Sequence, residues 1–181
     1  MKIEFNVKYG KNTIVIPIPE GTKLANSPGM SNLYGQVFTI INQIPQDATV
    51  STKVKWKKFR LEDCGKRDGL YDRSSGTMAY KANTWTAFIK DWDKYKAPTF
   101  LEDGYYAIDD ELKDQYFTAN VGDLLIFADI PDDAPTTIQE FNQLRDKYRD
   151  IGGPITSAEV YINYKADGSP WETNHIELVR G

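Results

Sequence analysis

The side chains best suited to acid–base, nucleophilic or metal chemistry are scarce in this 181-residue chain. It has one histidine, His175, and one cysteine, Cys64. A lone cysteine excludes an internal disulfide, and a structural zinc site needs several Cys or His ligands. The sequence contains no G-x-S-x-G, no H-E-x-x-H and no glycine-rich phosphate-binding motif. It therefore predicts no catalytic residue, no cofactor and no metal site, so that the chain is not expected to be an enzyme.

The remaining reactive groups have simpler interpretations. His175 is expected to lie on a strand with its ring at the sheet surface. Lys66 and Arg67 would lower the pKa of a neighbouring Cys64 thiol, but with no second Cys or His a small buried or loop thiol is the better interpretation. Two carboxylate groups could bind a divalent ion, yet neither has the EF-hand spacing, so they are expected to hydrate the surface. They are Asp109-Asp110-Glu111 and Asp129, Asp132 and Asp133.

Charge is distributed unevenly along a chain whose net charge is −4. Residues 53–73 hold eight Lys or Arg against four acids, whereas residues 102–133 hold ten acids against Lys113 alone. One interpretation is two solvated faces of opposite sign. A sharper one is a head-to-tail contact in which the basic edge of one protomer meets the acidic edge of the next, which closes into a ring. The residues predicted for this protomer interface are Lys55, Lys57, Lys58, Arg60, Asp129, Asp132 and Asp133.

Composition favours strands. Apolar residues make up 40% and aromatic residues 13% of the chain, with 11 Tyr, and such enrichment is typical of sheets and interfaces. The first ten residues alternate charged and apolar types, unlike a signal peptide. The longest apolar run, residues 124–128, is far shorter than the roughly 20 residues that span a bilayer. We therefore expect a soluble protein made in a reducing cytosol, with no membrane partner.

Periodicity places the elements that must position these groups. Period-two alternation predicts a hairpin from residues 3–9 and 14–18, and strands over 49–61, 84–89, 116–118 and 121–130. Apolar residues at helical spacing predict a helix over 28–43, and a Thr137–Glu140 capping box starts another over 137–150. The apolar residues of the strand change from even positions, up to Trp56, to odd positions, from Phe59, and this change predicts a bulge near Lys57. Glycines and charges predict a loop over 64–76. A last hairpin joins 158–164 to 175–179 around 166–170.

These elements predict a mainly β (α+β) fold, a small β-barrel or sandwich of about eight strands with two decorating helices. We expect residues 1–46 to form an N-terminal hairpin and helix, and residues 47–181 to form the main β domain.

The second half of the chain resembles head–tail connector, or neck, proteins of tailed phages, some of which are described as minor capsid or head-closure proteins. The likeness is one of order and spacing over four segments. They are the basic strand 57–64 with Ser74-Ser75-Gly76, the stretch from Ala82 through Ile89 to Tyr95 and Pro98, the stretch Phe117-Thr118 to Gly122–Ile126, and the residues from Ile138 through Ile155-Thr156-Ser157 and Gly168-Ser169-Pro170 to His175 and Glu177.

The resemblance implies a structural virion protein, made in the host cytoplasm, that forms a ring between the portal and the tail. Its partners would be further copies of itself and the neighbouring portal, adaptor and tail proteins, and DNA would pass through the channel without sequence recognition. An alternative is a small acidic binding protein of a mobile element that inhibits a host defence system, since such proteins are often tyrosine-rich and free of motifs.

Overall fold

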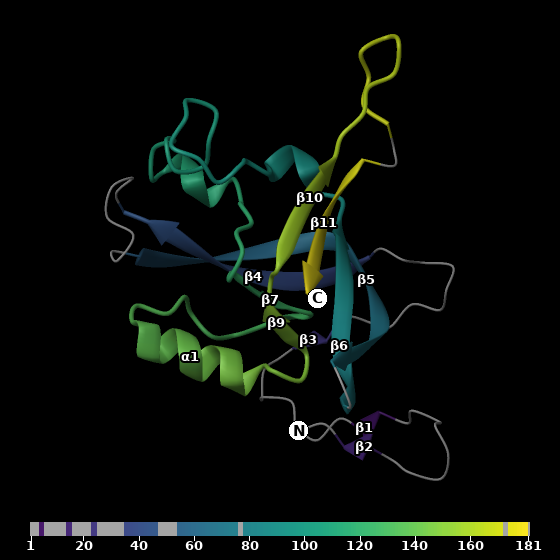
Figure 1. Ribbon diagram of the computed structural model, residues 1–181. Helices are drawn as coiled ribbons and strands as arrows, with labels where there is room; N and C mark the ends of the chain where they lie inside the picture. Colours follow the sequence, from purple (N-terminus) through teal and green to yellow (C-terminus); the bar gives the residue numbers. More distant parts are fainter. Residues whose placement is uncertain are drawn as a thin grey trace.

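The computed structural model describes residues 4–5, 14–15, 23–24, 35–46, 54–75, 78–171 and 174–180, with the backbone alone for the first three ranges and for residues 69–83. Its largest part is one antiparallel sheet of seven strands in the order β10-β11-β6-β5-β4-β7-β9 (Figure 1). The strands are Ser157–Tyr161 (β10), His175–Arg180 (β11), Met78–Ile89 (β6), Val54–Ser75 (β5), Gln36–Pro45 (β4), Leu124–Ile126 (β7) and Gly152–Pro154 (β9). The prediction of a mainly β fold is confirmed.

Two further pairs of short strands complete the described sheets. Glu4–Phe5 (β1) pairs with Ile14–Val15 (β2), which confirms the N-terminal hairpin at these residues. Lys23–Leu24 (β3) pairs with Ala128–Asp129 (β8). Among the described residues there is one α-helix, Ile138–Lys147 (α1), and there are two short 3-10 turns at Trp92–Lys94 and Leu112–Asp114.

The helix predicted over 28–43 is wrong for its described part, because residues 36–45 form the strand β4. β4 lies between β5 and β7 and is buried on both faces. Phe38 and Ile40 face a core cluster enclosed by the sheet, whereas Ile41 faces a second cluster under α1. A strand with two apolar faces loses its alternation, and its run of apolar residues then resembles a buried helix.

The same two clusters explain why the apolar residues of β5 change from even to odd positions after Trp56. Trp56 packs towards the α1 cluster, while Phe59 and Leu61 pack on the enclosed cluster. The register with β4 is continuous from Val54 to Leu61, so the bulge predicted near Lys57 is wrong. The register shifts instead where β5 passes Glu62 and Asp63, and Asp63 has a positive φ of 48°, a conformation that Asp tolerates better than most residues.

The loop predicted over 64–76 is also wrong in its described part. β5 continues to Ser75 and pairs with β6 from Cys64↔Ile89 to Ser75↔Met78. The strand predicted over 84–89 is confirmed as the end of β6, and its alternate residues Trp85, Ala87 and Ile89 are all buried in the enclosed cluster. The C-terminal hairpin is confirmed as well, with Tyr161 opposite His175 and a turn closed by the bond from Lys165 N to Ser169 O.

α1 begins at the predicted cap. The Thr137 side chain accepts a hydrogen bond from Glu140 N, and Phe141 and Leu144 are buried against the outer face of β4 and β7. Figure 1 shows α1 lying along one side of the sheet. The Trp56 and Phe141 rings stack here with centroids 5.9 Å apart, which fixes the helix against β5.

The seven-stranded sheet is not closed into a barrel, so the barrel alternative is wrong for the described strands. Its two edge strands, β9 and β10, are nevertheless consecutive in the chain, with Ile155 and Thr156 between them. The two ends of the sheet approach each other, because Arg180 on β11 donates to Gly152 O on β9 at 3.3 Å. An alanine at Gly153 would place its Cβ 2.4 Å from Arg180 Nη1, so the Arg180 side chain would have to shift.

β4 belongs to the sheet formed by the later strands. Residues 36–45, which lie within the segment 1–46, pair with β5 and β7 of that sheet.

Candidate functional site

Several of the residues predicted to join two protomers contact one another within one chain. β5 carries the basic side chains, and the segment from β8 to α1 carries the acidic ones. Lys58 Nζ donates hydrogen bonds to Ile130 O at 2.7 Å and to Asp132 O at 2.8 Å. An ammonium group held by two backbone carbonyls fixes the segment after β8 against β5, which is a structural role inside the protomer.

Two more of the predicted basic residues have acidic partners in the same chain. Arg60 Nε lies 3.2 Å from Asp129 Oδ2, and Arg60 also pairs with Glu62. These carboxylates raise the pKa of the Arg60 guanidinium. Lys57 points to the opposite face of β5 and lies 2.6 Å from Asp114 Oδ1, which lowers the pKa of Asp114.

Asp132 is held from the side of α1. Lys147 Nζ lies 2.6 Å from its Oδ1, and the Tyr148 hydroxyl donates to its Oδ2. Partial burial opposes these bonds, and the balance leaves the pKa of Asp132 below its usual value. Of the seven predicted interface residues, Lys55 and Asp133 are exposed and have no ion pair among the described residues.

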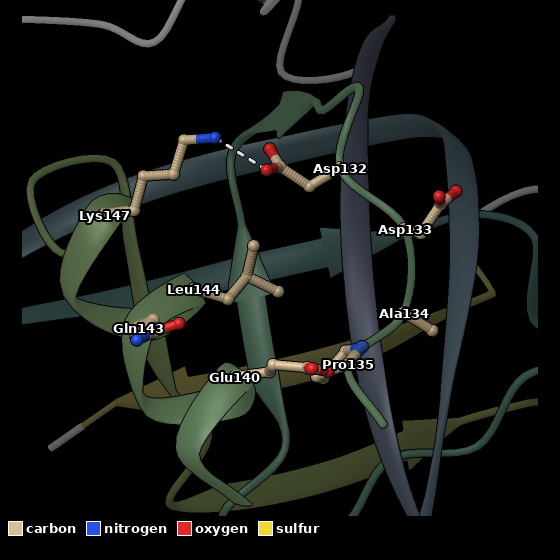
Figure 2. A pocket seen from close by; sticks show the side chains of 8 residues that line it. All are labelled: Asp132, Asp133, Ala134, Pro135, Glu140, Gln143, Leu144 and Lys147. Atoms are coloured by element: carbon tan, nitrogen blue, oxygen red, sulfur yellow. Dashed lines mark hydrogen bonds and ion pairs between the residues drawn. The ribbon is translucent and has the colours of Figure 1, made fainter. Parts of the chain in front are cut away.

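A hollow of about 330 Å³ lies between α1 and the extended segment that precedes it (Figure 2). Its lining includes three carboxylates, of which Asp132 is bonded as above and Glu140 accepts hydrogen bonds from the Thr136 backbone and hydroxyl. Ala134, Pro135 and Leu144 supply apolar surface. The lining holds no Ser, Thr, Cys or His side chain.

A buried carboxylate, missed by sequence reasoning, connects β4 to the turn before β7. Asp123 is fully buried and accepts hydrogen bonds from the Asn42 side chain, from Gln43 N and from Asn120 N, at 2.7 to 2.8 Å. Burial raises the pKa of Asp123 to about 6, against the opposing effect of these donors. The sequence feature that could have indicated a buried polar partner was Asn42, a polar residue inside an apolar strand.

The lone cysteine, Cys64, and the lone histidine, His175, both lie in surroundings that indicate a structural role. Cys64 is buried in the enclosed core, where burial strongly raises the pKa of its thiol, so proximity to Lys66 and Arg67 in sequence does not activate it. The His175 ring stacks on Tyr161 with centroids 5.1 Å apart, and its Nε2 lies 3.1 Å from Glu177 Oε1. The structure thus places His175 on the sheet surface, as predicted.

An ordered loop projects from the sheet between β6 and β7 (Figure 1). Its ends meet where Tyr95 bridges Phe117, and its buried Tyr105 donates a 3.3 Å hydrogen bond to Lys113 O. Its surface is acidic and partly apolar. The exposed side chains include Phe100, Leu101, Glu102, Asp103, Asp109, Asp110, Glu111 and Leu112.

Within the described ranges, no three His, Cys, Asp or Glu side chains converge as a metal site would require. In the same part of the chain, no helix has the length and apolar character needed to cross a membrane. No protein family, no curated protein and no solved structure matches this chain.

Proposed function

We propose that this chain is a structural virion protein of a phage neck, which forms a ring that joins the portal or head to the tail. The proposal rests on one observation above all. The four segments that carry the resemblance supply β5, β6, β7 and the α1–β11 region, which are parts of one sheet and of the helix that covers it. A likeness in segment order thus corresponds to elements that pack together.

The proposed ring needs a contact surface other than the one predicted from charge. Lys57, Lys58, Arg60, Asp129 and Asp132 already have partners in their own chain. Lys55 and Asp133 keep exposed, unpaired charges, and they are the two members of the predicted set that we retain as ring contacts. As an exposed pair they would contribute roughly 0–1 kcal/mol each time, so their role would be to set register. No catalytic role, cofactor or metal is part of the proposal.

Purified particles of the phage that encodes the chain test this function. Mass spectrometry should detect the protein in joined particles, and an in-frame deletion should yield filled heads and free tails that fail to join. Complementation with the wild-type gene should restore joining. Absence of the protein from particles, or normal joining without it, would refute the neck function.

A charge swap tests the ring contact separately. Lys55→Glu should reduce incorporation into particles, and adding Asp133→Lys in the same chain should restore it. If both variants enter particles as the wild type does, the ring uses other residues, while the neck function itself stays open to the deletion test.

The loop between β6 and β7 favours a second candidate, an acidic binding protein that inhibits a host defence system. Glu102, Asp103, Asp109 and Glu111 are exposed and have no cationic partner in the described part of the chain. Such carboxylates beside exposed Phe100 and Leu101 suit a basic protein surface. This candidate predicts that deletion lowers plating efficiency only on hosts that carry the defence system, with head–tail joining unchanged.

A further inference from the structure

The outer edge of β10 is an open edge of the seven-stranded sheet. β10 pairs with β11 on one side, and no described strand pairs with its other side. The opposite edge strand, β9, has three residues with the sequence Gly-Gly-Pro, and a proline and short length both discourage pairing. β10 has five residues and contains no Pro, Lys or Gly. The two edges therefore differ in their readiness to accept another strand.

β10 also exposes apolar surface at its end. Val160 is 45% exposed and Tyr161 is 40% exposed. The register with β11 puts Ala158 and Val160 on the face of the buried Ile176 and Leu178, and puts Glu159 and Tyr161 on the solvent face. A strand added beside β10 would extend both faces, with its apolar residues next to Val160.

The solvent face holds a charge conflict at this edge. Glu159 lies directly opposite Glu177 in the register of β10 and β11, and like charges in this position destabilise a sheet. Glu177 lies beside His175, but Glu159 accepts a hydrogen bond from the Tyr161 hydroxyl and has no Lys or Arg partner in the described ranges. A cation on the outer side of Glu159 would relieve the repulsion.

The ring of Tyr161, on β10 itself, provides a surface for such a cation. Tyr161 stacks on His175 of β11, with ring centroids 5.1 Å apart, which holds the Tyr161 ring at the solvent face. The aliphatic part of a Lys or Arg side chain packs well on such rings while its charged end reaches a carboxylate.

We propose that β10 is a docking edge for an extended strand of a partner protein, with a Lys or Arg of that strand facing Glu159 and a small apolar residue facing Val160. Strand addition supplies main-chain hydrogen bonds, and the alternating side chains supply specificity. A second copy of β10 is a poorer occupant, because β10 carries Glu159 and has no Lys or Arg to offer. The proposal depends on the edge and holds whether or not the chain is a neck protein.

Fluorescein-labelled peptides test the proposal with the full-length protein. The probe is an eight-residue peptide that alternates valine with lysine or threonine, and its counterpart has glutamate in place of lysine. Fluorescence anisotropy should show the lysine peptide binding about tenfold more tightly than the glutamate peptide, as expected for replacing an attractive cross-strand pair by a repulsive one. Alternate N-methylation of the lysine peptide should abolish binding, because it removes the donors that a strand needs.

Variants assign the binding to β10. Glu159→Lys should reverse the preference between the two peptides, whereas Asp146→Lys, a charge reversal on the exposed face of α1, should leave it unchanged. Val160→Lys should weaken both peptides at least about tenfold, since an edge lysine blocks pairing. Val121→Lys, at a residue that is 75% exposed and outside the sheet, is its control. Circular dichroism should be the same for all four variants.

Three results would overturn the proposal. The first is equal affinity for both peptides, or no binding of either. The second is a preference that Glu159→Lys leaves unchanged, which would place the binding elsewhere. The third is a wild-type dimer in size-exclusion chromatography with light scattering that Val160→Lys dissociates, which would identify the occupant as a second copy of this chain.

Discussion

The side-chain amide of Asn42 donates a 2.8 Å hydrogen bond to the carboxylate of Asp123, and both residues are fully buried. The same amide group donates to Thr118 O at 2.7 Å. Asn42 lies on β4, an interior strand of the sheet, whereas Asp123 ends the turn that leads into β7. This pair therefore fixes that turn to an interior strand, where a buried carboxylate needs every donor around it.

The pH dependence of stability should report Asp123. Its pKa of about 6 in the folded state exceeds the unfolded value of roughly 3.9. The folded state holds this proton more tightly, so the contribution of Asp123 to the free energy of unfolding falls as pH rises from about 4 to about 6, by on the order of 3 kcal/mol. Urea unfolding measures the free energy of unfolding of the wild type and of Asp123→Asn from pH 4 to 7. The wild-type value minus the variant value should fall by this amount as the pH rises.

Asp133→Asn is the control for this measurement, because Asp133 is exposed and has no ion pair in the described ranges. Its difference from the wild type should stay constant over the same pH range. A difference between the wild type and Asp123→Asn that is constant or grows with pH would contradict the raised pKa.

Lys58 should contribute to stability within a single protomer. Lys58→Met keeps the aliphatic chain but removes the bonds to Ile130 O and Asp132 O, and should lower the free energy of unfolding by about 1–3 kcal/mol. Lys55→Met, at an exposed neighbour on the same strand, should change it by less than about 0.5 kcal/mol. Tryptophan fluorescence in urea measures both. Equal stabilities would mean that Lys58 is available to another molecule.

Phe141 should anchor α1 to the sheet. Phe141→Ala removes a 6% exposed ring that stacks on Trp56, and should lower the free energy of unfolding by roughly 3–5 kcal/mol. Ile138→Ala truncates a side chain of the same helix that is 60% exposed, and should be almost neutral. A small effect of Phe141→Ala would show that the helix is held by other contacts.

The start of α1 should depend on one hydroxyl. Thr137→Ala removes the acceptor for Glu140 N and should lower the free energy of unfolding by about 1 kcal/mol. Thr137→Ser keeps the acceptor and should retain most of the stability. Chemical denaturation followed by circular dichroism distinguishes the two, and equal losses in both variants would assign the effect to the threonine methyl group.

Local signals predicted the elements that have one buried face. β11 and the Trp85–Ile89 part of β6 keep their alternation, and α1 has a cap and an apolar stripe. β4 was predicted as a helix because both of its faces are buried, and period alone does not distinguish such a strand from a helix. Its β-branched residues, Val37, Thr39, Ile40, Ile41 and Ile44, were the available signal for a strand.

Most of the charged residues predicted for a protomer interface have partners within their own chain. Opposite charges on β5 and on the segment from β8 to α1 attract each other, as the sequence suggested. Sequence separation does not say whether such segments meet within one chain or between two. Here β8 passes β4, since Thr39 Oγ1 donates to Ala128 O at 2.8 Å, and β5 is the next strand beyond β4. The fold thus satisfies most of the charges internally.

The continuity of β9 and β10 has a consequence for how this sequence can vary in length. Ile155 and Thr156 alone join strands that lie at the two ends of the sheet order, and Thr156 N is bonded to Val179 O. An inserted or deleted residue there would shift the register of both ends at once. The turn at 165–169 closes a single hairpin, so homologues should differ in length at that turn and should keep the spacing from Gly152 to Tyr161.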